Sequence, residues 1–209
     1  VGEIFPVETR VGAVTHFTYY IKPTIRAEDR GFDGVEIATP AGVTSVDSLR
    51  IGGVNEDDFT RTIREDGTAF EIHLPRRLET TDSGTLVEVV FNAPVLREVG
   101  NFFDGKVFDR ARPHEVRQQI NPGNAAAEVA SERLSVRTPL SRSLVFEPRI
   151  SPNPFTPNGD KVNDVVNISY TLLRITTAVP VSIEIYDLSG ALVKEVYSGE
   201  GSIGEYNRF

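Results

Sequence analysis

The chain has 209 residues, of which 39% are hydrophobic and 25% are charged, a composition typical of globular rather than disordered proteins. Its net charge of −8 at pH 7 repels nucleic-acid phosphates and anionic lipid head groups at long range, so we do not expect nucleic-acid binding. The sequence has no cysteine, which excludes disulfides and thiol catalysis. It also has no apolar run near the roughly 20 residues needed to cross a bilayer.

The chain begins at Val1 and contains no methionine. We therefore expect a processed or trimmed product, and cleavage of a secretion signal before Val1 would explain this beginning. The expected location is extracytoplasmic: the periplasm, the outer-membrane surface or the medium.

Alternation of apolar and polar residues with a period of two dominates the sequence. In residues 15–21, Phe17, Tyr19 and Ile21 share one face, and residues 70–74, 166–172 and 181–186 alternate in the same way. This pattern predicts strands with one buried face and one solvated face. Turn-forming residues separate the strands, so the sequence predicts an all-β protein built from sandwiches.

Helical signals are weak. Residues 113–120 and 124–133 could each form a short helix, but neither has a long apolar stripe. We interpret residues 112–130 as a long connection with one or two helical turns.

The clearest boundary lies near Ile150. Residues 151–160, Ser-Pro-Asn-Pro-Phe-Thr-Pro-Asn-Gly-Asp, contain three prolines and a glycine, which is typical of a stiff connector followed by a turn. We therefore predict two immunoglobulin-like β-sandwich modules in tandem. The first, residues 1–150, is immunoglobulin-like or cohesin-like, and the second is residues 151–209.

The second module resembles a known bacterial family. Residues 153–164, Asn-Pro-Phe-Thr-Pro-Asn-Gly-Asp-Lys-Val-Asn-Asp, are similar to the "NPFxPNGDGxND" opening of C-terminal sorting domains of secreted proteins. These domains resemble the immunoglobulin-like domain of the flagellar hook-capping protein. Residues 168–172 and 181–190 fit the same pattern, whereas Lys161 replaces the usual glycine. The resemblance implies an extracytoplasmic β-sandwich involved in surface attachment, sorting or assembly.

The resemblance also predicts an incomplete second module. The family continues into a Trp-Asp-Gly turn and closing strands, whereas the sequence ends at Phe209 before them. A sandwich without those strands has open sheet edges and a partly uncovered apolar face. Either further strands or a partner protein would cover that face.

Candidate chemistry is sparse, and calcium is the only cofactor that the sequence suggests. Asn158, Asp160, Asn163 and Asp164 place four oxygen-bearing side chains around one glycine turn, and Ca²⁺ takes six to eight oxygen ligands. The favoured alternative is an Asx-turn in which these side chains cap their own backbone amides. No nucleophile elbow or phosphate-binding loop occurs, so we predict no catalytic residues.

Histidines and aromatic pairs have simpler interpretations. His16, His73 and His114 lie far apart in the sequence, and we expect solvent-facing or loop positions for them. In the pairs Tyr19-Tyr20 and Phe102-Phe103, one member of each faces outward if the pair lies in a strand. We expect Phe103 to pack inside, and the role of Tyr20 stays open.

These observations favour a non-enzymatic structural or adaptor protein of the bacterial envelope that mediates protein–protein assembly. A variant is an accessory subunit of a larger membrane complex, respiratory or photosynthetic, whose partners are other envelope proteins. The alternative is a carbohydrate- or ligand-binding surface module. A hydrolase with scattered carboxylates in the first module ranks lowest, because the sequence has no other catalytic signal. Sequence alone does not exclude it, since carboxylate pairs meet only in the fold.

Overall fold

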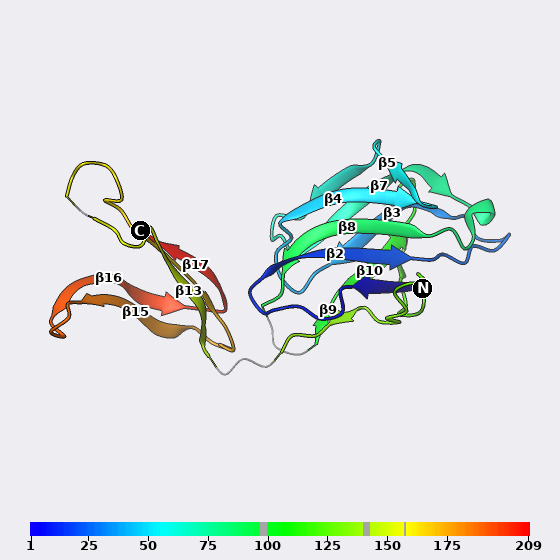
Figure 1. Ribbon diagram of the computed structural model, residues 1–209. Coiled ribbons are helices and arrows are strands. Elements are labelled where there is room, and N and C mark those ends of the chain that lie inside the picture. Colours follow the sequence, from blue (N-terminus) through cyan, green and yellow to red (C-terminus); the bar gives the residue numbers. More distant parts are fainter. Residues whose placement is uncertain (97–99, 140–142, 157) are drawn as a thin grey trace. The chain divides into compact units, whose positions relative to one another are not determined.

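The computed structural model describes residues 1–96, 100–139, 143–156 and 158–209. The chain divides into two compact units, Val1–Leu140 and Ser141–Phe209. Strands dominate both units (Figure 1), and in the described residues the one helical element is the three-residue 3₁₀ turn η1 (Thr80–Asp82). The predicted all-β class is therefore confirmed.

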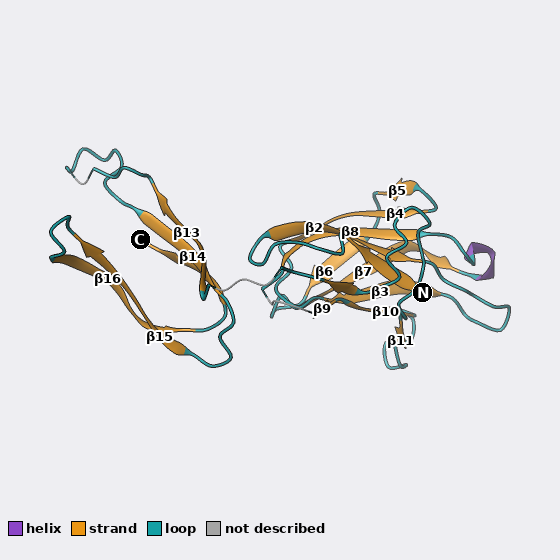
Figure 2. Cartoon of the chain, turned by 60° about the horizontal axis from the view of Figure 1, so that its bottom comes forward, coloured by secondary structure: helices purple, strands orange, loops and turns teal. Residues whose placement is uncertain are grey.

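Unit 1 is a sandwich of two five-stranded sheets, which Figure 2 shows as two layers. The first sheet has the order β1 (Gly2–Phe5), β2 (Val14–Ile21), β8 (Val87–Pro94), β4 (Ser45–Ile51), β5 (Val54–Glu56). The second has the order β11 (Gln118–Gln119), β10 (Asp104–Phe108), β3 (Phe32–Ala38), β7 (Ala69–Leu78), β6 (Thr60–Ile63). A separate pair joins β9 (Asn101–Phe102) to β12 (Ser135–Val136).

The core of unit 1 follows directly from the predicted alternation. Phe17 on β2 lies directly opposite Phe91 on β8, and both are fully buried. Phe103 packs on Phe17 with ring centroids 4.9 Å apart, and Phe70 from the other sheet packs on Phe91 at 5.1 Å. Such tilted aromatic pairs between facing sheets stabilise a sandwich core beyond simple area burial.

Tyr19 occupies a position in this core that glycine makes accessible. Its hydroxyl oxygen lies 2.4 Å from the point where a side chain on Gly105 would place a Cβ, and Gly2 faces the same ring. Burial raises the pKa of Tyr19 far above its ordinary value, and the charge of Asp104 adds to the effect. Two glycines, one on β1 in the first sheet and one on β10 in the second, thus make room for one buried phenol.

The long connection predicted at residues 112–130 contains the short strand β11, irregular backbone and two isolated hydrogen-bonded turns, at residues 112–115 and 126–130. Its backbone is held by Glu3, which is fully buried. The two carboxylate oxygens of Glu3 accept hydrogen bonds from the backbone N–H groups of Ala125, Ala126, Ser131 and Glu132 at 2.6–3.0 Å. The Glu3 carboxylate thus satisfies four backbone N–H groups that would bond to backbone carbonyls in a helix.

Unit 2 contains a three-stranded sheet and a hairpin. The sheet has the order β13 (Val145–Ser151), β14 (Asn167–Leu172), β17 (Gly204–Arg208). The hairpin pairs β15 (Val179–Tyr186) with β16 (Leu192–Gly201). The two face each other, because the Arg208 guanidinium lies 4.1 Å from the Tyr197 ring centroid, and a Cβ on Gly201 would meet Leu172.

The division between the units falls earlier than the position that we expected near Ile150. Residues 145–151 form β13, which pairs with β14 inside unit 2. The prolines at 152 and 154 therefore mark the end of the first strand of unit 2 rather than the connector. A proline-rich stretch disfavours helix and pairing locally, but it does not tell a linker from an inter-strand loop.

Candidate protein-interaction surface

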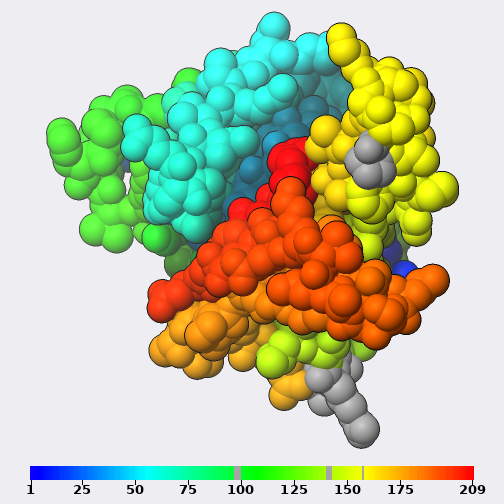
Figure 3. All heavy atoms as spheres, turned by 90° about the vertical axis from the view of Figure 1, so that its left-hand side faces the viewer, coloured from blue at the N-terminus to red at the C-terminus, as the bar shows by residue number. Residues whose placement is uncertain are grey.

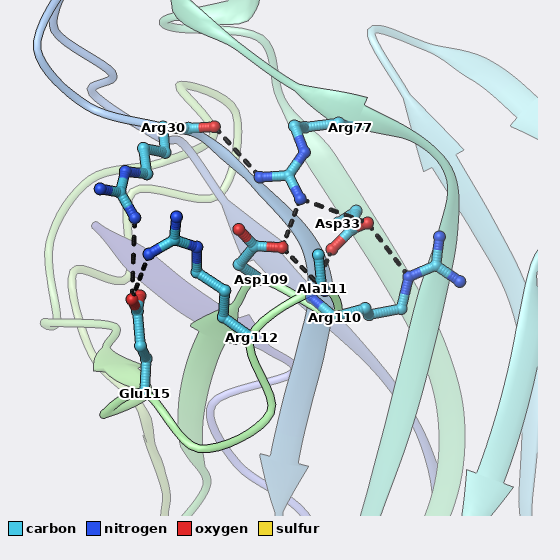
Figure 4. A network of polar contacts seen from close by, with 8 residues as sticks. All are labelled: Arg30, Asp33, Arg77, Asp109, Arg110, Ala111, Arg112 and Glu115. Carbon is cyan, nitrogen blue, oxygen red and sulfur yellow. Dashed lines mark hydrogen bonds and ion pairs between the residues drawn. The ribbon is translucent and has the colours of Figure 1, made fainter.

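The outer face of the β3–β7–β10 sheet carries a network of ion pairs (Figure 4). Arg77 on β7 donates to Asp109, which follows β10, and lies 3.8 Å from Asp33 on β3. Arg110 donates its backbone N–H to Asp33 at 2.9 Å. The hydrogen bond from Arg77 is the main reason why the pKa of Asp109 lies below its usual value. The network fastens the chain after β10 onto the sheet.

A second cluster lies further along the same face. Glu36 and Glu71 are direct cross-strand partners on β3 and β7, an arrangement in which like charges repel. Arg117 pairs with both carboxylates, and its guanidinium lies 4.1 Å from the ring centroid of Phe108. Lys106, whose Nζ lies 3.7 Å from Glu36, adds to the neutralisation of this carboxylate pair, and Arg117 anchors the long connection to the sheet.

A cleft of about 290 Å³ opens at the end of unit 1 beside the first network. Phe32, Phe108 and Ile120 form apolar parts of its lining, and Arg30 and Glu115 lie among its polar residues. Arg30 is 3.7 Å from Glu115, so these charges pair with each other across the lining. The volume is near the lower limit for a small-molecule site.

The four residues of the predicted calcium loop come together, but their oxygens serve the loop itself. Asn158 accepts the N–H of Asp160 at 3.1 Å, and Asp160 accepts the N–H of Val162 at 2.7 Å. Asp164 accepts the N–H groups of Gly159 and Lys161 at 2.8 and 2.6 Å. Asn163 contributes its backbone carbonyl, which accepts the N–H of Thr156 at 2.9 Å.

This bonding changes the acidity of the loop carboxyls. Backbone N–H bonds, first from Val162 and from Gly159 respectively, hold the pKa values of Asp160 and Asp164 below their ordinary value. Over the described part of the chain, no three His, Cys, Asp or Glu side chains form a group that could hold a metal ion. The geometry is that of the Asx-turn alternative, and calcium binding stays a prediction.

The histidines and aromatic pairs take the positions expected from their strands. His16 is exposed, with Nδ1 3.2 Å from the Asn92 side-chain oxygen, and His114 is exposed in the long connection. His73 is half-buried at 6.3 Å from the Phe108 ring. Phe103 is fully buried as predicted, whereas Phe102 is 65% exposed. Tyr20 is half-buried on the outer face of β2.

Unit 2 differs from unit 1 in how little of its apolar surface is covered. Among the described residues of unit 2, the buried hydrophobic side chains are Tyr170, Leu172 and Leu173. Val181, Ile183 and Ile185 alternate along β15 as predicted, but each is only half-buried. The exposed large hydrophobic residues of this unit are Leu144, Val145, Ile150, Phe155, Val162, Val165, Tyr186, Leu188, Leu192, Val193, Ile203 and Phe209.

Strand pairing in unit 2 is equally incomplete. Among the described strands, β13 and β17 each pair only with β14, and β15 and β16 pair only with each other. Figure 3 shows the surface of the β15–β16 hairpin in orange. Unpaired edges beside uncovered apolar side chains are the features by which sheets recruit a further strand. This surface of unit 2 is the candidate interaction site.

No protein-family model matches the sequence, and no curated protein matches it. Among solved structures, the chain is similar to the pilus backbone protein RrgB of Streptococcus pneumoniae, with a TM-score of 0.35, 14% identity and 98% of this chain covered. A structure of the full-length major pilin RrgB from the same organism gives a TM-score of 0.37 at 13% identity, with 97% of this chain covered. The chain spans 44% and 33% of those two chains.

The polar anchors of unit 1 were not predicted from the sequence. Glu3 and Arg117 act on partners more than 30 residues away, as the bonds of Glu3 to Ala125 and of Arg117 to Glu36 show. The local pattern around each looks like an ordinary strand or loop. The structure also contains, in the residues that it describes, no helix long and apolar enough to span a membrane.

Proposed function

We propose that this chain is a structural adaptor of the bacterial envelope, which joins other proteins through the uncovered apolar surface of unit 2. The observation that carries the proposal is the contrast between the units. Unit 1 encloses one large cluster of buried hydrophobic side chains, whereas unit 2 exposes apolar residues such as Ile150 at 55% and Val193 at 64%. Exposed apolar patches of this kind mark protein-interaction sites.

The resemblance of residues 151–197 to C-terminal sorting domains supports an extracytoplasmic location. The loop of residues 158–164, which carries the most specific part of that resemblance, is held by hydrogen bonds within the loop. The exposed apolar side chains of the same unit suit a module whose partners are other envelope proteins. An accessory subunit of a larger membrane complex, respiratory or photosynthetic, is one variant of this role.

A pull-down from detergent-solubilised envelope membranes tests the proposal. The chain should recover partner proteins in stoichiometric amounts. A variant with Val145, Ile150 and Val193 changed to serine should lose them, because it removes apolar contact area. The matched control changes Val14, Val54 and Val116 of unit 1, which are also exposed, and should keep the partners.

Circular dichroism of both variants shows whether the folds are intact. Recovery of the chain alone, or equal loss of partners in the two variants, would overturn the adaptor role.

A ligand-binding role is the second candidate, and the cleft at the end of unit 1 favours it. Its lining combines the rings of Phe32 and Phe108 with the polar groups of Arg30 and Glu115, a mixture used to bind small polar ligands. A glycan array probed with the chain tests this role. Binding that is lost on changing Arg30 to alanine would support it, and an array without signal would rule out a carbohydrate ligand.

A further inference from the structure

We propose that an extended strand of a partner polypeptide adds to the free edge of β15. The added strand has apolar side chains at alternate positions, which face the three-stranded sheet, and basic side chains at the positions between them. This inference rests on the proposed adaptor role and specifies the chemistry of the partner. It is carried by three observations on unit 2: an unpaired edge, an uncovered strip of the opposite sheet, and an unbalanced row of glutamates.

The first observation is the edge itself. β15 is eight residues long, and in the described structure it pairs only with β16. One edge of its backbone N–H and C=O groups therefore has no strand partner, which is the template for strand addition. The free edge of β13 is less suitable, because Pro148 interrupts it in the middle, where its register with β14 also shifts. The proline of β15, Pro180, lies next to the beginning of the strand and leaves residues 181–186 uninterrupted.

The second observation is the order in which the strands face each other. Tyr197 and Gly201 place β16 across from β17 and β14, through contacts with Arg208 and Leu172. Leu172 is 2% exposed, and its neighbour Tyr170 on the same face of β14 is also buried. A Cβ on Gly201 would also meet Val181 of β15, at 2.9 Å, so β15 lies over β14 on the side away from β17.

That order leaves β13 without a strand opposite it. Val145 and Ile150 are cross-strand partners of Leu172 and Ile168, so they point to the inner face of the sheet. Both are nevertheless exposed, at 44% and 55%. A strand beside β15 would lie across from β13 and cover these two side chains. Addition at β16 or β17 would leave them uncovered.

The third observation concerns charge on the outward face of the hairpin. Glu184 lies directly opposite Glu195, and Glu200 lies opposite Pro180 on the same face. Like charges placed directly opposite destabilise a sheet. In the part of the chain that the structure describes, no salt bridge involves any of these three glutamates. Lysine or arginine on the outward face of an added strand would sit beside Glu184 and balance it.

Three eight-residue peptides test the inference: one alternating isoleucine and lysine, one with the same composition in scrambled order, and one alternating isoleucine and glutamate. Binding is measured by fluorescence anisotropy, and backbone protection by hydrogen exchange. The alternating basic peptide should bind best and should slow exchange along β15. Ile150→Ser and Glu184→Lys should each weaken its binding by about tenfold, whereas Leu188→Ser in the exposed turn should not. Glu184→Lys should also strengthen binding of the acidic peptide.

Equal binding of the scrambled peptide, or protection on β16 or β17 instead of β15, would overturn the strand addition. Failure of all three peptides would also overturn it. If envelope partners were still recovered in the pull-down, the adaptor role would survive with a different contact. Failure of both experiments would overturn both proposals.

Discussion

Changing Glu3 to glutamine is the sharpest test of how unit 1 is held together. The carboxylate is fully buried, and it accepts N–H bonds from Ala125 and Ala126 on one oxygen and from Ser131 and Glu132 on the other. Glutamine has nearly the same shape, but one of its two oxygens is replaced by an NH₂ group, which donates and cannot accept. Two N–H donors would then face a third donor.

The expected loss follows from the bonds that glutamine cannot make. A hydrogen bond to a charged group contributes roughly 1.5–3 kcal/mol, so losing two of them lowers the free energy of unfolding by about 3 kcal/mol at the lower limit. The total free energy of unfolding of a typical domain is only about 5–15 kcal/mol. The variant should therefore still fold, with a clearly lower midpoint of denaturation.

The pH dependence adds an independent check. Burial alone raises the pKa of Glu3, but the N–H bonds from Ala126, Glu132 and Ala125 outweigh it, and the pKa lies below the ordinary value of 4.5. Because the pKa is depressed in the folded state, this stabilisation is complete above about pH 4.5 and is lost as the pH falls through the folded-state pKa. The glutamine variant should lack this part of the acid dependence.

Urea denaturation at several pH values measures both effects when it is followed through the backbone amide signals of unit 1 in NMR. Glu128→Gln is the matched control, since Glu128 is exposed in the same connection, and it should change the midpoint very little. If Glu3→Gln lowers the free energy of unfolding by less than about 1 kcal/mol, the N–H bonds to Glu3 do not anchor the connection.

Two further substitutions test local packing and the loop. Gly105→Ala places a Cβ 2.4 Å from the Tyr19 hydroxyl and should lower the free energy of unfolding of unit 1 by about 1–3 kcal/mol, measured by calorimetry. The control Gly42→Ala, whose Cβ would have no atom within 4 Å, should leave it unchanged. Equal effects of the two variants would contradict the packing argument. Asp164→Asn leaves at most one acceptor oxygen for the two N–H bonds and should loosen the loop locally, seen as changed amide shifts near Lys161 in NMR without a change in the melting temperature. Unchanged shifts would show that Asp164 does not order the loop.

Much of the fold could be predicted from the period-two pattern. Phe17 and Tyr19 on β2, and Phe70 and Ile72 on β7, lie in the core as their alternation requires. Alternation fixes which face of a strand is buried, because successive side chains point to opposite sides. The same pattern identified Val181 and its neighbours on β15.

The errors arose where local pattern and tertiary context conflict. The prolines after Ile150 have the composition of a linker, but the preceding residues pair with β14, and pairing is not encoded in composition. Residues 112–130 contain only isolated hydrogen-bonded turns, because Glu3 binds part of their backbone from β1 and Arg117 fastens the segment to Glu36 and Glu71. Such contacts join residues as far apart as Glu3 and Ala126, and a single sequence carries no local signal for them.

The two units therefore represent two ways of completing a β-sandwich. Unit 1 closes itself: it has five strands in each main sheet, and charged anchors hold the long connection against it. Unit 2 has a three-stranded sheet and a two-stranded one, so the smaller sheet cannot cover the larger, and Val145 and Ile150 are left in solvent. Burying apolar surface stabilises a fold by about 25 cal/mol for each Å². In the strand addition that we propose, the same surface would give the partner strand its affinity, so the incomplete burial that weakens unit 2 alone would also suit it to assembly.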